Sequence, residues 1–397
     1  MKQTTCPNGY QSVAATASPF LLFSIALFAG CSDNHHPDDK VAPTRSDKST
    51  DSPKPSTDKT TITQDDLNYV VPSEYISDDD TIRLEQQLAE QPQLIKPRVD
   101  LIYHYQSILD DKNKARHLHW LIKHRPRAKV LGMHVSRIAY AVNDNKWLTA
   151  HRLWDINIEK NPKDAAILGH AGFFYANGFT TDEAILLLER AVLLSVDKEK
   201  GPRLLILANT YSDWALRTPS ESETEKQANK ALATFTEALK YTKQVQVRLE
   251  TLIHATVIAD LQTDTATLRQ WAKQLLAESE STTDKQLRAR SASYAHVGLG
   301  IAAMGLPPKP TPQRIKTACD HLDLSGKAFS QLNQAGEQIH SGYVDLTLAK
   351  LLLKQGEQKA VLNFFATINP TIVDQPFTPW IKLLKEGQSP DLDKGLR

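Results

Sequence analysis

The feature that most limits how this chain can fold is a spacing of small and large side chains that occurs three times between Leu131 and Tyr241. In each copy an alanine is followed four positions later by a bulky residue, and three positions after that by a small or polar one. Offsets of three, four and seven place side chains on one face of an α-helix, so the spacing predicts equivalent helices. The leading alanines lie 34 and 47 positions apart, and the copies are Ala150–Trp154–Asn157, Ala184–Leu188–Ala191 and Ala231–Phe235–Ala238.

A second helical segment precedes each of these helices. It is marked by residue pairs three positions apart: Arg137 and Tyr140, Ala171 and Phe174, Ala208 and Tyr211. One helical hairpin cannot bury its apolar face alone, whereas stacked hairpins bury a continuous core, so a repeat of this length predicts a helical solenoid. The alternation that is typical of β-strands does not occur at useful length.

The middle copy resembles the tetratricopeptide repeat. The residues that carry the resemblance are Ala171, Phe174, Gly178, Asp182, Glu183, Ala184, Leu188 and Ala191. The resemblance implies an all-α, right-handed superhelical solenoid of antiparallel helix hairpins, whose inner groove binds an extended peptide or a partner helix. The first copy departs from the pattern at Arg137, and the third has about 13 extra residues that we expect to form a lengthened turn and an extended second helix.

We expect the solenoid to cover residues 77–387, with a first helix that begins after Ser77 and runs to about Glu90. Residues 98–124 form a plausible degenerate copy of the hairpin, and residues 388–397 are expected to be a flexible tail. The clearest repeats are predicted at 130–162, 164–197, 201–242 and 339–371.

Residues 1–31 resemble a bacterial lipoprotein signal. The apolar run Phe20–Ala29 is ten residues long, which is too short to span a bilayer, and Gly30 and Cys31 follow it. The resemblance implies lipidation of Cys31 and anchoring to the outer membrane on its periplasmic side; an ordinary cleaved signal or an uncleaved anchor is the alternative. Residues 32–76 are expected to be a disordered linker, because Ser, Thr, Asp, Lys and Pro dominate the stretch 32–66.

No arrangement of residues typical of catalysis, phosphate binding or dinucleotide binding is present, so we expect no enzymatic activity, no cofactor and no metal. Seven of the 13 histidines lie between His104 and His170, but they do not have the spacing of a zinc site. The net charge of +1 argues against bulk capture of nucleic acid. Cys319 is interpreted as a small buried residue on an amphipathic helix.

The expected working surface is the groove lined by the first helix of each repeat. The lysine–asparagine set with which some tetratricopeptide proteins hold a C-terminal carboxylate is not reproduced, and some groove positions could equally pack between hairpins. The candidate partner-binding residues are His134, Ile138, Tyr175, Leu205, Asn209 and Ser212.

A second candidate surface is a run of cations that could meet an acidic partner, anionic lipid or a cell-wall polymer, or could be a solvated helix face. It consists of Lys112, Lys114, Arg116, Lys123, Arg125 and Arg127.

The sequence therefore predicts a non-enzymatic scaffold of the bacterial cell envelope, a membrane-anchored lipoprotein that binds other envelope proteins and no nucleic acid. The alternative is a protein that binds or processes peptidoglycan or polysaccharide on an α-solenoid.

Overall fold

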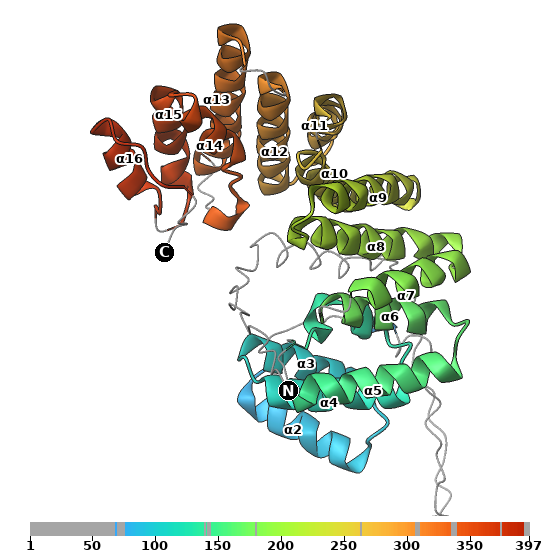
Figure 1. Cartoon of the computed structure of the whole chain (residues 1–397). Coiled ribbons are helices and arrows are strands. Elements are labelled where there is room, and N and C mark those ends of the chain that lie inside the picture. Colours follow the sequence, from blue (N-terminus) through green and yellow to red (C-terminus); the bar gives the residue numbers. More distant parts are fainter. Residues whose placement is uncertain are drawn as a thin grey trace, which may run out of the picture.

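The computed structural model describes residues 68–69, 76–138, 140, 144–178, 181–262, 264–305, 310–334, 340–373 and 375–392. These residues form fifteen α-helices and four short 3₁₀-helices, and they contain no β-strand. The helices follow one another in an elongated, curved array in which each packs mainly on its neighbours in the chain (Figure 1). The predicted all-α solenoid is confirmed.

The N-terminal part of the array includes the first two clear repeats. Its elements are α2 (Asp78–Glu90), α3 (Lys96–Ser107), α4 (Asp111–His124), η3 (Lys129–Gly132), η4 (His134–Ser136), α5 (Asn145–Lys160), α6 (Ala165–Ala176) and α7 (Thr181–Leu194).

The C-terminal part begins with the two helices of the third clear repeat, which have 21 residues each. Its elements are α8 (Asp197–Arg217), α9 (Glu221–Tyr241), α10 (Val245–Ala259), α11 (Thr265–Ser279), α12 (Lys285–Met304), α13 (Pro312–Gln334), η5 (Ser341–Tyr343), α14 (Thr347–Lys354), α15 (Gln358–Ile368), η6 (Asn369–Thr371) and α16 (Thr378–Lys385).

Successive hairpins stack mainly through the second helix of one and the first helix of the next, and their first helices also touch. Helices α6, α8, α10, α12 and α14 each contact the next member of this series, in addition to their own hairpin partners α7, α9, α11, α13 and α15. The first helices therefore form one continuous layer, and the second helices cover it from one side.

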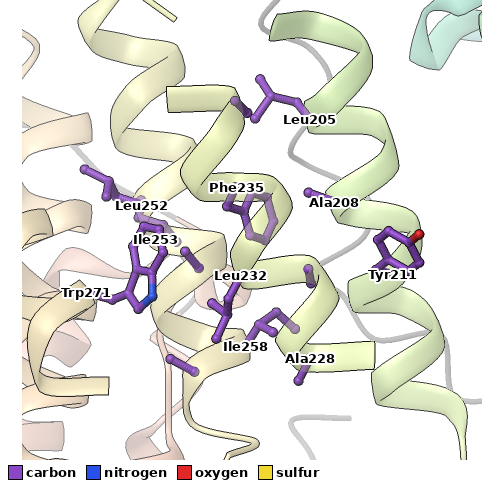
Figure 2. Close-up of a cluster of buried hydrophobic side chains, with 14 of the residues drawn as sticks. Leu205, Ala208, Tyr211, Ala228, Leu232, Phe235, Leu252, Ile253, Ile258 and Trp271 are labelled. Carbon is purple, nitrogen blue, oxygen red and sulfur yellow. The ribbon is translucent and has the colours of Figure 1, made fainter. Parts of the chain in front are cut away.

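The core between α8 and α11 shows how the repeat spacing produces this packing. Phe235 on α9 is fully buried and lies toward α8 and its residue Ala208 (Figure 2). Leu252 and Trp271, on α10 and α11, belong to the same cluster. Small side chains allow the helices to approach, and the large ring fills the space between them, so the packing density of the interior is maintained.

Side chains at helix starts fix where many of the elements begin. Ser77 accepts a hydrogen bond from the amide of Asp80, whose carboxylate accepts in return from the amide of Ser77, which makes a complete capping box. Asp110, Asp164 and Asp284 accept amide hydrogen bonds at the starts of α4, α6 and α12 in the same manner. The predicted start after Ser77 and end near Glu90 are confirmed.

The first repeat differs from the prediction. Its upstream segment forms the two 3₁₀-turns η3 and η4, and Arg137 and Ile138 are not helical, so the expected helix before Tyr140 is wrong. The hydroxyl of Ser136 donates to the carbonyl oxygens of Leu131, at 2.9 Å, and Met133, at 2.7 Å. Such local side-chain bonds compete with the regular helical ladder.

The extra residues of the third repeat lengthen both helices. Only residues 218–220 separate α8 from α9, and each helix is 21 residues long. The extended second helix is confirmed, while the lengthened turn is wrong because the polar insertion continues the helices instead. Near the C-terminus, the described part of the predicted repeat 339–371 begins with the 3₁₀-turn η5, and its first α-helix, α14, starts only at Thr347.

Contacts at both ends of the described chain extend beyond the predicted solenoid. Tyr69, in the predicted linker, donates its hydroxyl to Asp100 at 2.6 Å. Leu392, in the predicted tail, is buried in the C-terminal core. The signal segment 1–31 with Cys31, and residues 32–67 of the linker, lie outside the described residues. Within the described part of the chain, no helix is both long and apolar enough to cross a membrane.

Candidate functional site

Polar side chains join successive first helices along the array. His254 on α10 places Nδ1 at 3.0 Å from Oδ1 of Asn209 on α8. One step further, Arg290 on α12 forms an ion pair with Glu250 on α10. We call these four residues the first-helix ladder. Glu250 and His254 lie four positions apart on α10, and they bond to Arg290 on α12 and to Asn209 on α8, so the three first helices carry a row of amide, imidazole and charged groups.

The environment keeps the imidazole of the ladder uncharged. Burial lowers the pKa of His254 to about 4, so the ring is neutral at physiological pH. The ring also makes an edge contact with Phe235, at 6.4 Å between ring centroids. Arg290 lies over the ring of Tyr343, with its guanidinium carbon 5.0 Å from the ring centroid. Both groups are therefore held in fixed positions by the packing around them.

Two carboxyl groups on the ladder helices have raised pKa values. Burial raises the pKa of Asp213 on α8 to about 6, although Arg217 and Arg137 both favour its charged form. Burial and the neighbouring Asp345 raise the pKa of Asp260 to about 6. With pKa values of about 6, both groups are mainly ionised at neutral pH and accept hydrogen bonds there, and they gain a donor only as the pH falls to about 6 and below.

Most of the predicted groove residues are part of the core. Ile138, Leu205 and Ser212 are buried, and Tyr175 is only 3% exposed. The hydroxyl of Tyr175 donates to Asp155. Ser212 donates back to the carbonyl oxygen of Ala208, at 2.9 Å. These four side chains hold helices together and leave little surface for a partner.

The remaining two predicted groove residues are accessible. His134 lies half-buried in η4, and Asn209 belongs to the ladder. Sequence reasoning thus identified one ladder member. The other three members, His254, Glu250 and Arg290, were missed, although a signal exists: Glu250 and His254 lie four positions apart, on one face of α10.

The predicted basic patch is divided among different contacts. Lys114 is buried and donates to Gln106 at 2.6 Å. Arg116 pairs with Glu85, and Arg127 pairs with Asp164, each at 2.5 Å. Lys112, Lys123, Arg125 and Arg127 remain at least partly exposed, at the two ends of α4. The six cations therefore do not form one surface.

Other candidates for chemistry do not converge. Within the described residues, no group of three or more His, Cys, Asp or Glu side chains is placed to hold a metal ion. Burial and the nearby carboxylates of Glu357 and Asp320 raise the pKa of Cys319 to about 11, so its side chain remains a thiol at neutral pH.

Comparison with protein families gives one finding. The model of the family "plant specific mitochondrial import receptor subunit TOM20" matches residues 177–307. The matched segment is about a third of the chain and contains α7 to α12 with the whole first-helix ladder. No curated protein sequence matches this chain.

This match overturns the bacterial interpretation. The family is a mitochondrial receptor, so the assignment to bacterial lipoproteins is wrong. Three further predictions are wrong for the same reason. They are the location at an outer membrane facing a periplasm, the membrane contact through an N-terminal lipid, and envelope proteins as partners. The scaffold role in the bacterial envelope and the alternative of a cell-wall or polysaccharide protein are wrong as well. The bacterial interpretation depended on residues 1–31 alone, which resemble a lipoprotein signal. The helical repeats do not indicate whether a protein belongs to a bacterial envelope or to a mitochondrion.

Proposed function

We propose that this chain is a polypeptide receptor of the type that the matching family model describes, a subunit that binds proteins for import into mitochondria. A segment of the imported protein binds along the first-helix ladder. The role assigned to the chain is binding, without catalysis.

The observation that carries this proposal is the ladder itself, within the matched segment. The amide of Asn209 has two N–H donors and a second oxygen lone pair beyond its contact with His254. A polypeptide backbone presents one donor and one acceptor per residue, so a row of such groups on successive helices suits a bound segment.

The burial of the ladder supports the same assignment. Its four side chains are half-buried, and two of its helices, α8 and α10, also carry the core residues Leu205 and Leu252. Hydrogen bonds formed in such surroundings are stronger than bonds formed in water, because the effective dielectric constant is lower. A segment that bonds to the ladder also covers the apolar atoms beside it.

The test uses the intact chain and the fluorescently labelled N-terminal segment of a precursor protein that mitochondria import. Binding is measured by fluorescence anisotropy for the wild type and for the double variant Asn209→Ala, His254→Ala. Loss of two hydrogen bonds worth about 1 kcal/mol each predicts binding weaker by at least tenfold.

The matched control is Thr234→Ala on α9. Its hydroxyl donates to the carbonyl oxygen of Lys230 within the same helix, at 2.7 Å, and it lies outside the ladder. The control is expected to bind as the wild type does. A double variant that folds normally by circular dichroism and binds with unchanged affinity contradicts the proposal.

A further inference from the structure

The turns of the array form two edges with different composition. Turns within hairpins lie along one edge, and turns between hairpins lie along the other, because the hairpins are antiparallel and stacked. We define the basic rim as residues 123–129, 159–164, 193–200 and 240–245, which follow second helices. The opposite edge consists of residues 144–146, 181–183, 217–225 and 260–264.

Contacts between successive turns make the basic rim continuous. Arg127 pairs with Asp164 at 2.5 Å, which joins the first two turns. Arg190, near the end of α7, donates to the carbonyl oxygen of Pro162 at 2.7 Å. The ammonium nitrogen of Lys200 lies 5.2 Å from the ring centroid of Tyr241, and this contact joins the start of α8 to the end of α9.

Over the turns in these two sets, the edges carry opposite charge, although the whole chain has a net charge of only +1. The opposite edge has two cations and eight carboxylates. The basic rim has only four carboxylates, Glu159, Asp164, Asp197 and Glu199, and ten cations: Lys123, Arg125, Arg127, Lys129, Lys160, Lys163, Lys198, Lys200, Lys240 and Lys243.

The centre of the basic rim also exposes aliphatic side chains. Leu193 is 82% exposed and Val196 57%, at the junction of α7 and α8. Leu194 is 44% exposed beside them, and Val245, at the start of α10, is 38% exposed. In the sequence, Lys198 and Lys200 follow Val196 closely, and Lys243 lies two positions before Val245. Four accessible aliphatic side chains among lysines form a combined apolar and cationic surface.

We propose that the basic rim docks on an anionic lipid bilayer, with Leu193, Leu194 and Val196 entering the interface and the lysines contacting lipid headgroups. Lysine side chains can extend their charged ends toward the headgroups while their methylene stems cover apolar surface. Basic residues near an anionic membrane add binding energy individually, and exposed aliphatic side chains add to it.

The composition favours a membrane over a protein partner. Protein interfaces are enriched in aromatic residues and arginine and depleted in lysine. Around Leu193 the exposed side chains include three aliphatic residues, Lys198 and no aromatic residue, together with Arg190 and the carboxylates of Asp197 and Glu199. A second copy of this chain could offer its acidic edge, but that pairing would leave the aliphatic side chains facing carboxylates.

The experiment measures sedimentation of the intact chain with vesicles of phosphatidylcholine containing 30% phosphatidylserine, and with vesicles of phosphatidylcholine alone. The expected result is binding to the anionic vesicles that decreases at 0.5 M salt. Replacing Lys198, Lys200 and Lys243 by Glu is expected to lower the partition coefficient at least tenfold, since each lysine contributes about fivefold. Leu193→Asp with Val196→Asp should lower it by a similar factor.

Two matched controls separate the rim from general effects of charge and polarity. The triple variant Lys273→Glu, Lys354→Glu, Lys359→Glu makes the same change in net charge at exposed positions outside the rim. Leu186→Asp adds a carboxylate at a 60% exposed position of α7, away from its end. Both controls should bind as the wild type does. Unchanged binding by the rim variants, equal loss in the controls, or salt-sensitive self-association without vesicle binding would overturn the proposal.

Discussion

At the scale of single residues, the unusual groups of this protein are carboxylates close to the first-helix layer. Asp213 is held near Arg137 and Arg217, yet burial still raises its pKa to about 6. Desolvation therefore outweighs two favourable charges. Such a group lowers stability when it is ionised, and it remains in the structure only because the surrounding packing determines its position.

The Asp213→Asn variant tests this cost. The folded pKa of about 6 lies above the value near 3.9 expected in the unfolded chain, so ionisation is disfavoured in the folded state. Stability should therefore be highest below about pH 4, fall as the pH rises toward 6, and then stay level. At pH 7.5 the asparagine variant should be more stable than the wild type by about 1–3 kcal/mol, and at pH 4 the difference should vanish.

Thermal unfolding at pH 4 and pH 7.5 provides the measurement. The exposed residue Asp320 supplies the control, since Asp320→Asn should shift the midpoint little at either pH. A stabilisation by Asp213→Asn that is the same at both pH values would show that ionisation is not its cause.

At the scale of elements, close approach of paired helices depends on small residues at the crossing points. In the hairpin α6–α7, a Cβ atom added at Gly172 would lie 2.7 Å from Cγ of Leu188 and 3.2 Å from the carbonyl oxygen of Ala184. A backbone oxygen cannot move aside as a flexible side chain can. Gly172 is therefore required by the distance between two helices and not by its own backbone conformation.

The Gly172→Ala variant should therefore destabilise the protein. Alanine is the better helix former by about 1 kcal/mol, but the clash with Leu188 should cost more, giving a net loss of about 1–2 kcal/mol. Gly342 has no neighbouring atom within 4 Å of an added Cβ, so Gly342→Ala should change stability by less than about 0.5 kcal/mol. Chemical denaturation of both variants makes the comparison; stabilisation by Gly172→Ala would show that the hairpin can open without cost.

At the scale of the whole molecule, contacts between neighbouring helices dominate. Helices α14 to α16 pack mainly among themselves and on α12 and α13. Phe365, Phe377 and Trp380 close this end, with the rings of Phe365 and Phe377 stacked at 5.1 Å. Stability in such an array is a sum of units and their interfaces, so damage at one end should remain local.

Removal of residues 375–397 tests this expectation. The truncation deletes Phe377 and Trp380 and exposes Phe365, so amide hydrogen exchange should become faster in α14 and α15. Exchange in α6 and α7 should stay within experimental error of the intact chain. Uniformly faster exchange along the whole array would show instead that the solenoid unfolds as one cooperative unit.

Local chemistry accounts for the parts of the fold that could be predicted from the sequence. Ser77 starts α2 through a capping box, and the three-four spacing around Phe235 placed a second helix correctly. Both signals act within one or two helical turns. The segment before Tyr140 was predicted wrongly because Ser136 bonds its own backbone, a competition that the spacing of apolar residues does not reveal.

What the sequence by itself determined is the class of structure: helices of given length, paired and repeated, with small and large residues at the contacts. Only the tertiary structure decided which helix faces stay accessible. Gly172 and Asn209 occupy equivalent positions in successive repeats, yet Gly172 is buried against Leu188 of its own hairpin and Asn209 bonds His254, 45 residues away. The physical reason is that helical periodicity depends on near neighbours, whereas burial of a side chain depends on every segment that packs against it.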